Sequence, residues 1–279
     1  AKQCAHALAL ALAMGAPNVG QAGGKLGRWL LLGSAARNGV AAAFAAADGF
    51  CGDLALLDKP FHGVFGITVD GPRFIASLAK GPSILEIGYK PWCAARQTMA
   101  AAQGFKEIMA EGVSPDSVQS IRVKVPPAYL AMVNHGVVSG DRSSHMTSLP
   151  YQLVLAALAP ENMYSLEFAP NPTPDAHKAW LGKITVSADD ALNVHFPRAW
   201  PAAIEVTSAA GTQQRLVTDI PGDPARTFDE TQVRQKYDRV LGPLLGTETT
   251  RALAGDALSA LSRPADASAL LAKIVATYS

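Results

Sequence analysis

The sequence predicts an α+β protein in which a mostly helical domain is interrupted by a smaller segment of mixed strands and helices. Ala-rich helical stretches fill the first fifty residues, strand-like segments lie in the middle, and helical segments return near the end. Because helical regions flank the strands, we expect one discontinuous helical domain with an α+β insertion. The expected divisions are 1–82 (helical), 83–220 (α+β) and 221–279 (helical, returning).

The N-terminal region predicts two helices within residues 3–50. The second follows Ser34, a plausible N-cap, and ends at Asp48-Gly49. Gly39 inside it suggests either close helix–helix approach or a small kink. Residues 51–82 are rich in Gly, Pro and Phe, which predicts loops and turns.

The central and C-terminal elements follow from local patterns. Alternation of apolar and charged residues after Ser120 indicates a strand with one wet face. Ala210-Gly211 between two apolar stretches indicates a hairpin. The expected elements are a strand over 84–92, a helix over 94–110, a strand over 118–125, a helix over 151–159, hairpin strands over 202–208 and 213–218, and helices from 228, from 247 and at the C-terminus.

Composition excludes several classes of protein. The chain has 279 residues, of which 49% are apolar, so it is long and apolar enough to fold without disulfides. Its 24 basic and 23 acidic residues form no basic cluster, so we expect no nucleic-acid partner. The three cysteines, Cys4, Cys51 and Cys93, are odd in number and far apart in the sequence, which favours a reducing, cytoplasmic location. Scattered histidines predict no metal site.

The N-terminal apolar run needs a separate interpretation. Lys2 followed by apolar residues from Ala5 to Ala16 is compatible with a signal peptide, but also with a buried Ala/Leu helix, which we favour. The run is shorter than the roughly 20 residues that cross a bilayer, so no membrane partner is expected. A chain that opens in a helix without Met also looks like a fragment.

Four motifs occur in a characteristic order along the chain. They are Gly33-Ser34-Ala35-Ala36-Arg37-Asn38-Gly39-Val40, Lys90-Pro91-Trp92-Cys93-Ala94-Ala95-Arg96-Gln97-Thr98, Ser148-Leu149-Pro150-Tyr151 and Pro221-Gly222-Asp223-Pro224. Together they resemble the MmgE/PrpD family, whose members include 2-methylcitrate dehydratase, cis-aconitate decarboxylase and iminodisuccinate epimerase. The resemblance covers nearly the whole chain.

The resemblance implies a large helical domain, a smaller α+β lid and an active site between them. Aligned in this way, the chain begins partway through the helical domain, so roughly the first third of a family member is missing. We therefore expect an exposed apolar face around 5–16 and 35–47. The family acts on small di- and tricarboxylic acids, needs no metal or organic cofactor, and usually forms homodimers.

Lys90 and Arg28 are the basic residues that the resemblance places at the site. Lys90 matches a family lysine at the entry to the lid, where it would bind a carboxylate or carry a proton. Arg28 aligns with a second family lysine and would bind substrate, but it cannot act as a base. The alternative for each is a solvated surface residue.

Other candidates are His145 and Tyr151 as proton carriers and Arg96 as a substrate ligand. His145 is expected in a loop, where a histidine is often merely solvated. Tyr151 is expected to bury its ring with its hydroxyl satisfied nearby. Arg96 would either join Lys90 or pair with an acidic neighbour, and Cys93 is interpreted as a packing residue.

Three positions depart from the family pattern: Leu31, Ala95 and Met99 stand where members commonly carry histidine. Decarboxylase members carry a histidine at the position of Ala95, and its absence here argues against cis-aconitate decarboxylation. We therefore expect a lyase or isomerase that abstracts a proton next to a carboxylate, by dehydration or epimerisation. The alternative is a catalytically inactive family member that serves as an oligomeric scaffold or organic-acid binder.

Overall fold

The computed structural model describes residues 1–15, 27–56, 70–79, 83–263 and 265–278. Helices make up 60% of the chain and accompany a small mixed sheet, which confirms the α+β, mostly helical class. The chain divides into two compact units, Ala1–Ser83 and Ile84–Ser279. The finer division into three segments stays a prediction.

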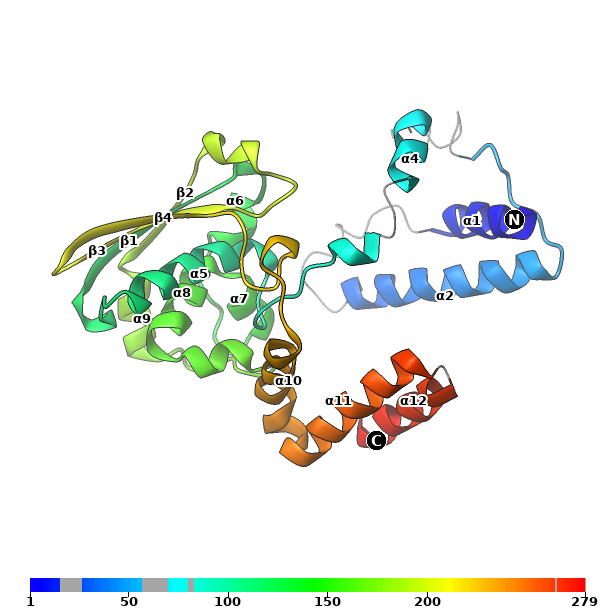
Figure 1. Ribbon diagram of the computed structural model, residues 1–279. Helices are drawn as coiled ribbons and strands as arrows, with labels where there is room; N and C mark the ends of the chain where they lie inside the picture. The colour runs from blue at the N-terminus through cyan, green and yellow to red at the C-terminus, as the bar shows by residue number, and fades with distance from the viewer. Residues whose placement is uncertain (16–26, 57–69, 80–82, 264, 279) are drawn as a thin grey trace. The chain divides into compact units, whose positions relative to one another are not determined.

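The first unit consists of three helices among its described residues: α1 (Lys2–Ala13), α2 (Gly27–Ala47) and α4 (Gly71–Leu78) (Figure 1). Helices α1 and α2 pack against each other. Helix α4 begins where the Asp70 side chain accepts a hydrogen bond from the Arg73 N–H, and Pro72 lies in its first turn.

Two expectations for this unit are wrong. Ser34 is not an N-cap, because α2 begins seven residues earlier and Ser34 lies inside it. The Leu30–Leu32 run favours helix strongly enough to carry α2 through Gly33. Residues 51–82 are not all loop, since they include α4; residues 57–69 and 80–82 lie outside the described residues. No atom lies within 4 Å of a Cβ built on Gly39, so of the two explanations given for this glycine, close helix approach finds no support among the described residues.

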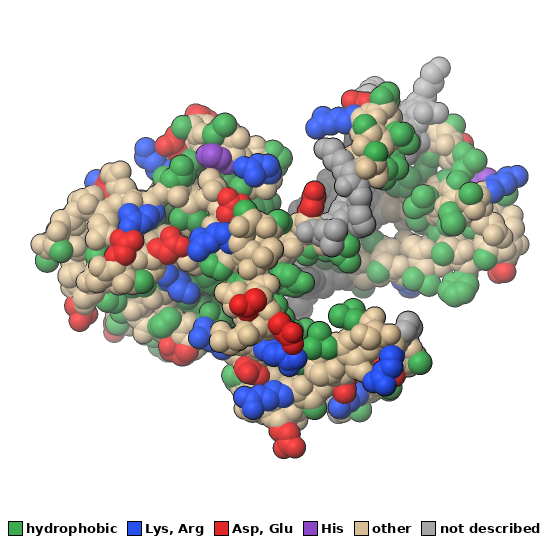
Figure 2. Space-filling model, viewed as in Figure 1, with side chains coloured by type: hydrophobic (Ala, Val, Ile, Leu, Met, Phe, Trp, Pro, Cys, Tyr) green, Lys and Arg blue, Asp and Glu red, His purple; other side chains and the backbone are tan. Residues whose placement is uncertain are grey.

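Large apolar side chains are exposed on this unit, including parts of the 5–16 and 35–47 segments where the family resemblance led us to expect an apolar face. Leu8, Leu30, Val40 and Phe44 are 68%, 72%, 59% and 70% exposed. Hydrophobic side chains are visible over α1 and α2 in Figure 2. One stretch, Leu30–Ala47 of α2, has the length and apolar composition of a membrane-crossing helix, although a helix from a water-soluble core passes the same test.

The second unit is built on a four-stranded sheet of order β2-β1-β3-β4. Strands β1 and β2 are parallel, whereas β1–β3 and β3–β4 are antiparallel, and β3 and β4 form the expected hairpin around Ala209-Ala210. The strands are β1 (Val118–Val125), β2 (Ile184–Ala188), β3 (Ala202–Ser208) and β4 (Gly211–Val217).

Helices cover one face of this sheet. Helix α5 (Arg96–Ala110) packs on β3 and β4, and α8 (Leu149–Leu158) packs against α5 and β2 (Figure 1). Ile121, Val123 and Val125 of β1 are buried, whereas Arg122 and Lys124 between them are exposed. The predicted alternation, β1 and the helices at α5 and α8 are therefore confirmed.

Shorter helices and the C-terminal helices complete the unit. Helix α10 carries the expected N-terminus, a capping box in which Asp229 and Gln232 exchange side-chain to backbone hydrogen bonds. Helices α10, α11 and α12 pack in succession. The remaining bounds are α6 (Pro127–Val133), α7 (Arg142–Thr147), α9 (Asp175–Leu181), α10 (Glu230–Leu245), α11 (Thr247–Ser262), α12 (Ala265–Tyr278), and the 3-10 turns η2 (Ser83–Glu86), η3 (Pro115–Ser117), η4 (Pro160–Tyr164), η5 (Asp190–Val194) and η6 (Pro224–Arg226).

The strand expected over residues 84–92 is wrong. The segment begins as the 3-10 turn η2 and continues as irregular backbone. Ile84 and Ile87 are 71% and 55% exposed, so the apolar run does not enter a core. Tyr89 donates its backbone N–H to the Gly222 carbonyl at 2.6 Å, and Pro91 has no N–H to continue a ladder.

Close packing of α5 on the sheet depends on Gly104. A Cβ there would lie 2.8 Å from Cγ2 of Ile204 and 3.1 Å from Cγ2 of Val217, so we expect Gly104→Ala to destabilise the protein by about 1–3 kcal/mol. Gly255→Ala in α11 is the matched control, because nothing lies within 4 Å of its Cβ. It should stabilise by up to about 1 kcal/mol. Urea unfolding followed by circular dichroism compares them, and equal stability would contradict the packing argument.

Candidate functional site

A cavity of about 360 Å³ lies within the second unit, where the segment before α5 meets the loops that precede β3 and follow β4. Six charged residues line it: Glu86, Lys90, Arg96, Arg198, Asp219 and Asp223. Gly88, Tyr89, Ala199, Trp200 and Pro224 complete the wall. The structure thus brings together two predicted site residues, Lys90 and Arg96.

Lys90 and Arg96 come from one short segment and are held differently. The Lys90 ammonium donates to the carbonyl oxygen of Ala94 at 3.1 Å, which holds it against the loop that leads into α5. Arg96 is the first residue of α5, and its Nη2 donates to Oδ2 of Asp223 at 2.5 Å. Its Nη1 is buried and has no hydrogen-bond partner among the described residues. A guanidinium nitrogen in this state can bind an anionic oxygen.

Asp223 connects the two sides of the cavity. Its side chain is 11% exposed and that of Arg96 is 18% exposed, so this ion pair is largely shielded from water. Oδ2 of Asp223 also accepts the backbone N–H of Ile220 at 2.8 Å. The sequence alternative in which Arg96 pairs with an acidic neighbour is confirmed, and the same arginine lines the cavity with Lys90.

Gly222 explains why two distant motifs meet here. Its φ is +97°, a conformation that favours glycine, and a Cβ on it would lie 2.3 Å from the Tyr89 carbonyl oxygen. The Tyr89 ring stacks on Phe228 with 6.4 Å between centroids. The Pro221–Pro224 turn therefore holds the segment that carries Lys90, a role that the motif did not reveal.

His145 and Tyr151 form a separate, buried group with His177. The expected loop position of His145 is wrong, because it lies in α7 and its side chain is fully buried. The His145 and Tyr151 rings meet edge-on at 4.7 Å, and the Tyr151 hydroxyl hydrogen-bonds His177 Nδ1 at 3.0 Å. The buried ring and satisfied hydroxyl expected for Tyr151 are confirmed. Neither residue lines the cavity of Lys90, and their catalytic roles stay predictions.

Burial sets the protonation of this group. Desolvation raises the pKa of Tyr151 to about 12, with Arg142 opposing the shift, so its hydroxyl is neutral at physiological pH. Desolvation, and then the charge of His145, lower the pKa of His177 below its ordinary 6.5. Nδ1 of His145 is 2.6 Å from the Asp141 carbonyl, which only accepts, so this nitrogen carries a proton.

Cys93 and Met99 are packing residues, and Arg28 lies in the other unit. Cys93 Sγ donates to the Tyr164 carbonyl at 3.4 Å, and burial raises its thiol pKa despite Arg142, Lys236 and Lys90 nearby, which fits a packing role. Met99 is fully buried in the core. The backbone of Arg28 lies in α2, in the first unit, and its side chain is outside the described residues.

Sequence reasoning missed four of the charged residues of this cavity. Asp223 lies in a motif that was noted for its turn and not for its carboxylate. Glu86, Arg198 and Asp219 carried no signal, because only the fold brings their loops together. No group of three His, Cys, Asp or Glu among the described residues is arranged to hold a metal ion.

The second unit is a domain in which helices cover one face of a mixed sheet and charged loops line a cavity at its edge. Residues 92–259 match the sequence profile described as the MmgE/PrpD C-terminal domain. The chain therefore belongs to the MmgE/PrpD family. A comparison with the curated proteins gave no match.

Most of the candidate residues lie inside the matched range. It includes Arg96, His145, Tyr151 and Asp223, whereas Lys90 lies two residues before it and Arg28 lies in the first unit. The family is linked to dehydratase and isomerase reactions of organic acids.

The shielded ion pair gives a direct stability test. Asp223→Ala leaves Arg96 partly buried without its partner and removes the acceptor of the Ile220 N–H, so we expect a loss of about 2–4 kcal/mol. The control is Arg122→Ala on the wet face of β1, which removes an exposed pair with Glu205 and should cost less than about 1 kcal/mol. If both variants lose the same free energy of unfolding, the shielded Asp223 pair stabilises the protein no more than an exposed pair does.

The depressed pKa of His177 predicts acid sensitivity. Its folded pKa lies below the unfolded value of about 6.5, so the unfolded state binds more protons and stability is lost as the pH falls through 6.5 toward the folded value. His177→Gln retains hydrogen-bonding atoms for Tyr151 but does not titrate. We expect the melting temperature of the variant to fall less than that of the wild type between about pH 7.5 and 5.5. Parallel pH profiles would assign the sensitivity to other groups.

Proposed function

We propose that this chain takes part in a lyase or isomerase reaction that removes a proton next to a carboxylate of a small di- or tricarboxylic acid. The coarser part rests on family membership, because the family is linked to organic-acid dehydratases and isomerases. The observation that carries the finer part is the cavity in which Lys90 and the unsatisfied Nη1 of Arg96 occur together.

The proposed binding mode divides the basic residues by their surroundings. Lys90 and Arg198 are exposed at the cavity, so they attract a carboxylate at modest desolvation cost. Arg96 is fixed by Asp223 at 2.5 Å, so it offers Nη1 in a set orientation without further ordering. Such preorganised cations also stabilise the charge that develops on a carboxylate when the neighbouring carbon loses its proton.

Proton removal requires a base within reach of the substrate. His145 and Tyr151 do not line the cavity, whereas the carboxylates of Glu86 and Asp219 do. Asp219 is half-buried, and its Oδ2 accepts a hydrogen bond from Thr218 Oγ1 at 2.7 Å, which orients it. We therefore propose Asp219 as the base that this unit contributes, with the carbon acid bound by Lys90 and Arg96.

Dehydration and epimerisation place different demands on the same site. A dehydratase needs an acid for the departing hydroxyl, whereas an epimerase needs proton carriers on both faces of the carbon. The basic side chains Lys90 and Arg198 can meet the first demand only if one of them donates a proton, and lysine is the one that can. Epimerisation would require a second proton carrier, on the other face of the carbon from Asp219.

A second candidate function is organic-acid binding without turnover. The observation that favours it is the full burial of Met99 and His145, which leaves those two positions to packing. Under this proposal the cavity of Lys90 still binds a di- or tricarboxylate. Both candidates therefore require the cavity to bind the acid, and only the first requires a C–H bond of that acid to be broken.

The proposal extends to assembly and location. Large apolar side chains exposed on α1 and α2 support a homodimer, as implied by the family resemblance. All three cysteines are free thiols, which supports a reducing, cytoplasmic environment.

Lys90→Met tests both candidates. Incubation of the protein with citrate-like and aspartate-like acids in D₂O, read by NMR, reports exchange of the C–H next to the carboxylate. We expect exchange in the wild type and a loss of about 100-fold in the variant, because an oriented charge at the developing anion is removed. Lys178→Met, an exposed lysine paired with Asp175, is the control.

Binding measured by calorimetry on the same proteins separates the outcomes. Binding without exchange in the wild type, weakened by Lys90→Met, selects the second candidate. Exchange and affinity that are both unchanged in Lys90→Met would remove this cavity from the function.

A further inference from the structure

A second cavity, of about 150 Å³, lies between α5 and α10. Its basic residues are Lys106 of α5 and Lys236 and Arg239 of α10. Trp92 closes one side, and the amides of Gln232 and Gln235 lie along α10. It shares no lining residue with the cavity of Lys90, so it is a separate place on the molecule.

The charge in this cavity is of one sign. No acidic residue lines it, and none of Lys106, Lys236 and Arg239 forms an ion pair in the part of the chain that the structure describes. Lys106 and Arg239 instead contact aromatic rings, and Arg239 also contacts a hydroxyl. The Lys106 ammonium lies 4.8 Å from the centre of the Trp92 ring, and the Arg239 guanidinium lies 4.8 Å from that of Tyr164.

Trp92 supplies an independent observation. The residue is 2% exposed, and its indole Nε1 is buried without a hydrogen-bond partner. An indole nitrogen can only donate, and buried donors in proteins nearly always have an acceptor. Trp92, whose indole N–H lacks an acceptor, lines the same cavity as the three cations.

Electrostatics agree with the geometry. Burial lowers the pKa of both Lys106 and Lys236, and the charge of Arg239 lowers that of Lys106 further. The cavity therefore holds two partly buried ammonium groups, and one of them is repelled by the Arg239 guanidinium. A bound anion would offset this repulsion.

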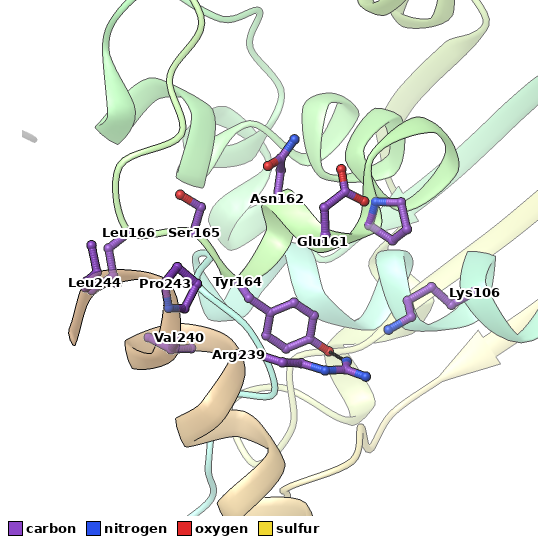
Figure 3. A pocket seen from close by; sticks show the side chains of 11 residues that line it. Lys106, Glu161, Asn162, Tyr164, Ser165, Leu166, Arg239, Val240, Pro243 and Leu244 are labelled. Atoms are coloured by element: carbon purple, nitrogen blue, oxygen red, sulfur yellow. Dashed lines mark hydrogen bonds between the residues drawn. The ribbon is translucent and has the colours of Figure 1, made fainter. Parts of the chain in front are cut away.

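A larger cavity adjoins the second one. It has a volume of about 730 Å³ and shares Lys106, Tyr164 and Arg239 with the cavity of Trp92 (Figure 3). In Figure 3 the Tyr164 hydroxyl accepts a hydrogen bond from Arg239, at 2.8 Å, and Lys106 projects toward the same space. Glu161 is the acidic residue that lines this larger cavity, and it does not line the smaller one.

We propose that the cavity formed by Trp92, Lys106, Lys236 and Arg239 binds a compact multivalent oxyanion, with an anionic oxygen that accepts the indole N–H of Trp92. Phosphoryl and carboxylate groups share this chemistry, and a volume of about 150 Å³ suits either inorganic phosphate or a small polycarboxylate. The proposal does not rest on the proposed function, because it uses none of the residues of the Lys90 cavity.

The test uses the full 279-residue chain. Phosphate and citrate are titrated separately at low ionic strength, with acetate as a monovalent comparison, and the indole N–H signals are followed by two-dimensional NMR. The chain has four tryptophans, and Trp92→Phe assigns the signal of Trp92. We expect that signal to shift with phosphate, with citrate or with both, and not with acetate at the same concentration.

Charge removal then locates the site. Lys236→Met should weaken binding by about tenfold, since one charge-assisted contact is lost from a half-buried position. The exposed-lysine control Lys178→Met should leave the shift of the Trp92 signal and its dissociation constant unchanged. A response to phosphate alone identifies a phosphoryl ligand, and a response to citrate alone identifies a carboxylate ligand.

Two results would overturn the proposal. The first is a Trp92 indole signal that does not move with either anion. The second is binding that Lys236→Met leaves intact, which would place the anion elsewhere. Because Lys236→Met alters a solvent-accessible helix position and leaves the core untouched, its fold can be verified from the unchanged signals of the other tryptophans.

Discussion

The contact between the segment before α5 and the 220–223 turn is the constraint on which the candidate sites depend. It consists of the hydrogen bond from Tyr89 to Gly222 and the ion pair between Arg96 and Asp223. The first is possible because Gly222 has no side chain, and the second is strengthened by its shielding from water. Together with the backbone hydrogen bonds that Cys93 donates to Met163 and Ala95 donates to Met146, this contact holds the Lys90 segment, which has no ladder of its own.

Two cavities with different electrostatics lie near this contact. Around Lys90, acidic and basic residues are equal in number, so an anion there meets both a binding cation and a possible base. Around Trp92 the charge is only positive, which suits binding and offers no acceptor for a proton. Charge balance therefore distinguishes a candidate reaction site from a candidate binding site, although both belong to one α+β unit of an MmgE/PrpD family member.

Local patterns predicted the elements that depend on local physics. Alternation predicted β1, Ala210-Gly211 predicted the hairpin, and Asp229 marked the start of α10, because pleat, turn and cap are each decided within a few residues. The same reasoning failed at Ser34 and over 84–92. There a competing helix and a long-range contact to Gly222 outweighed the local preference.

The sequence by itself determined the fold class and the family, since these follow from element order and motifs, and it named Lys90 and Arg96 as candidates. Only the tertiary structure decided that His145 is buried against Tyr151, that Asp223 holds Arg96, and that Trp92 shares a cavity with Lys106 and Lys236. The physical reason is distance along the chain. The ion pair of Arg96 joins residues 127 apart, and the burial of a side chain depends on every element packed around it, so no local pattern encodes either outcome.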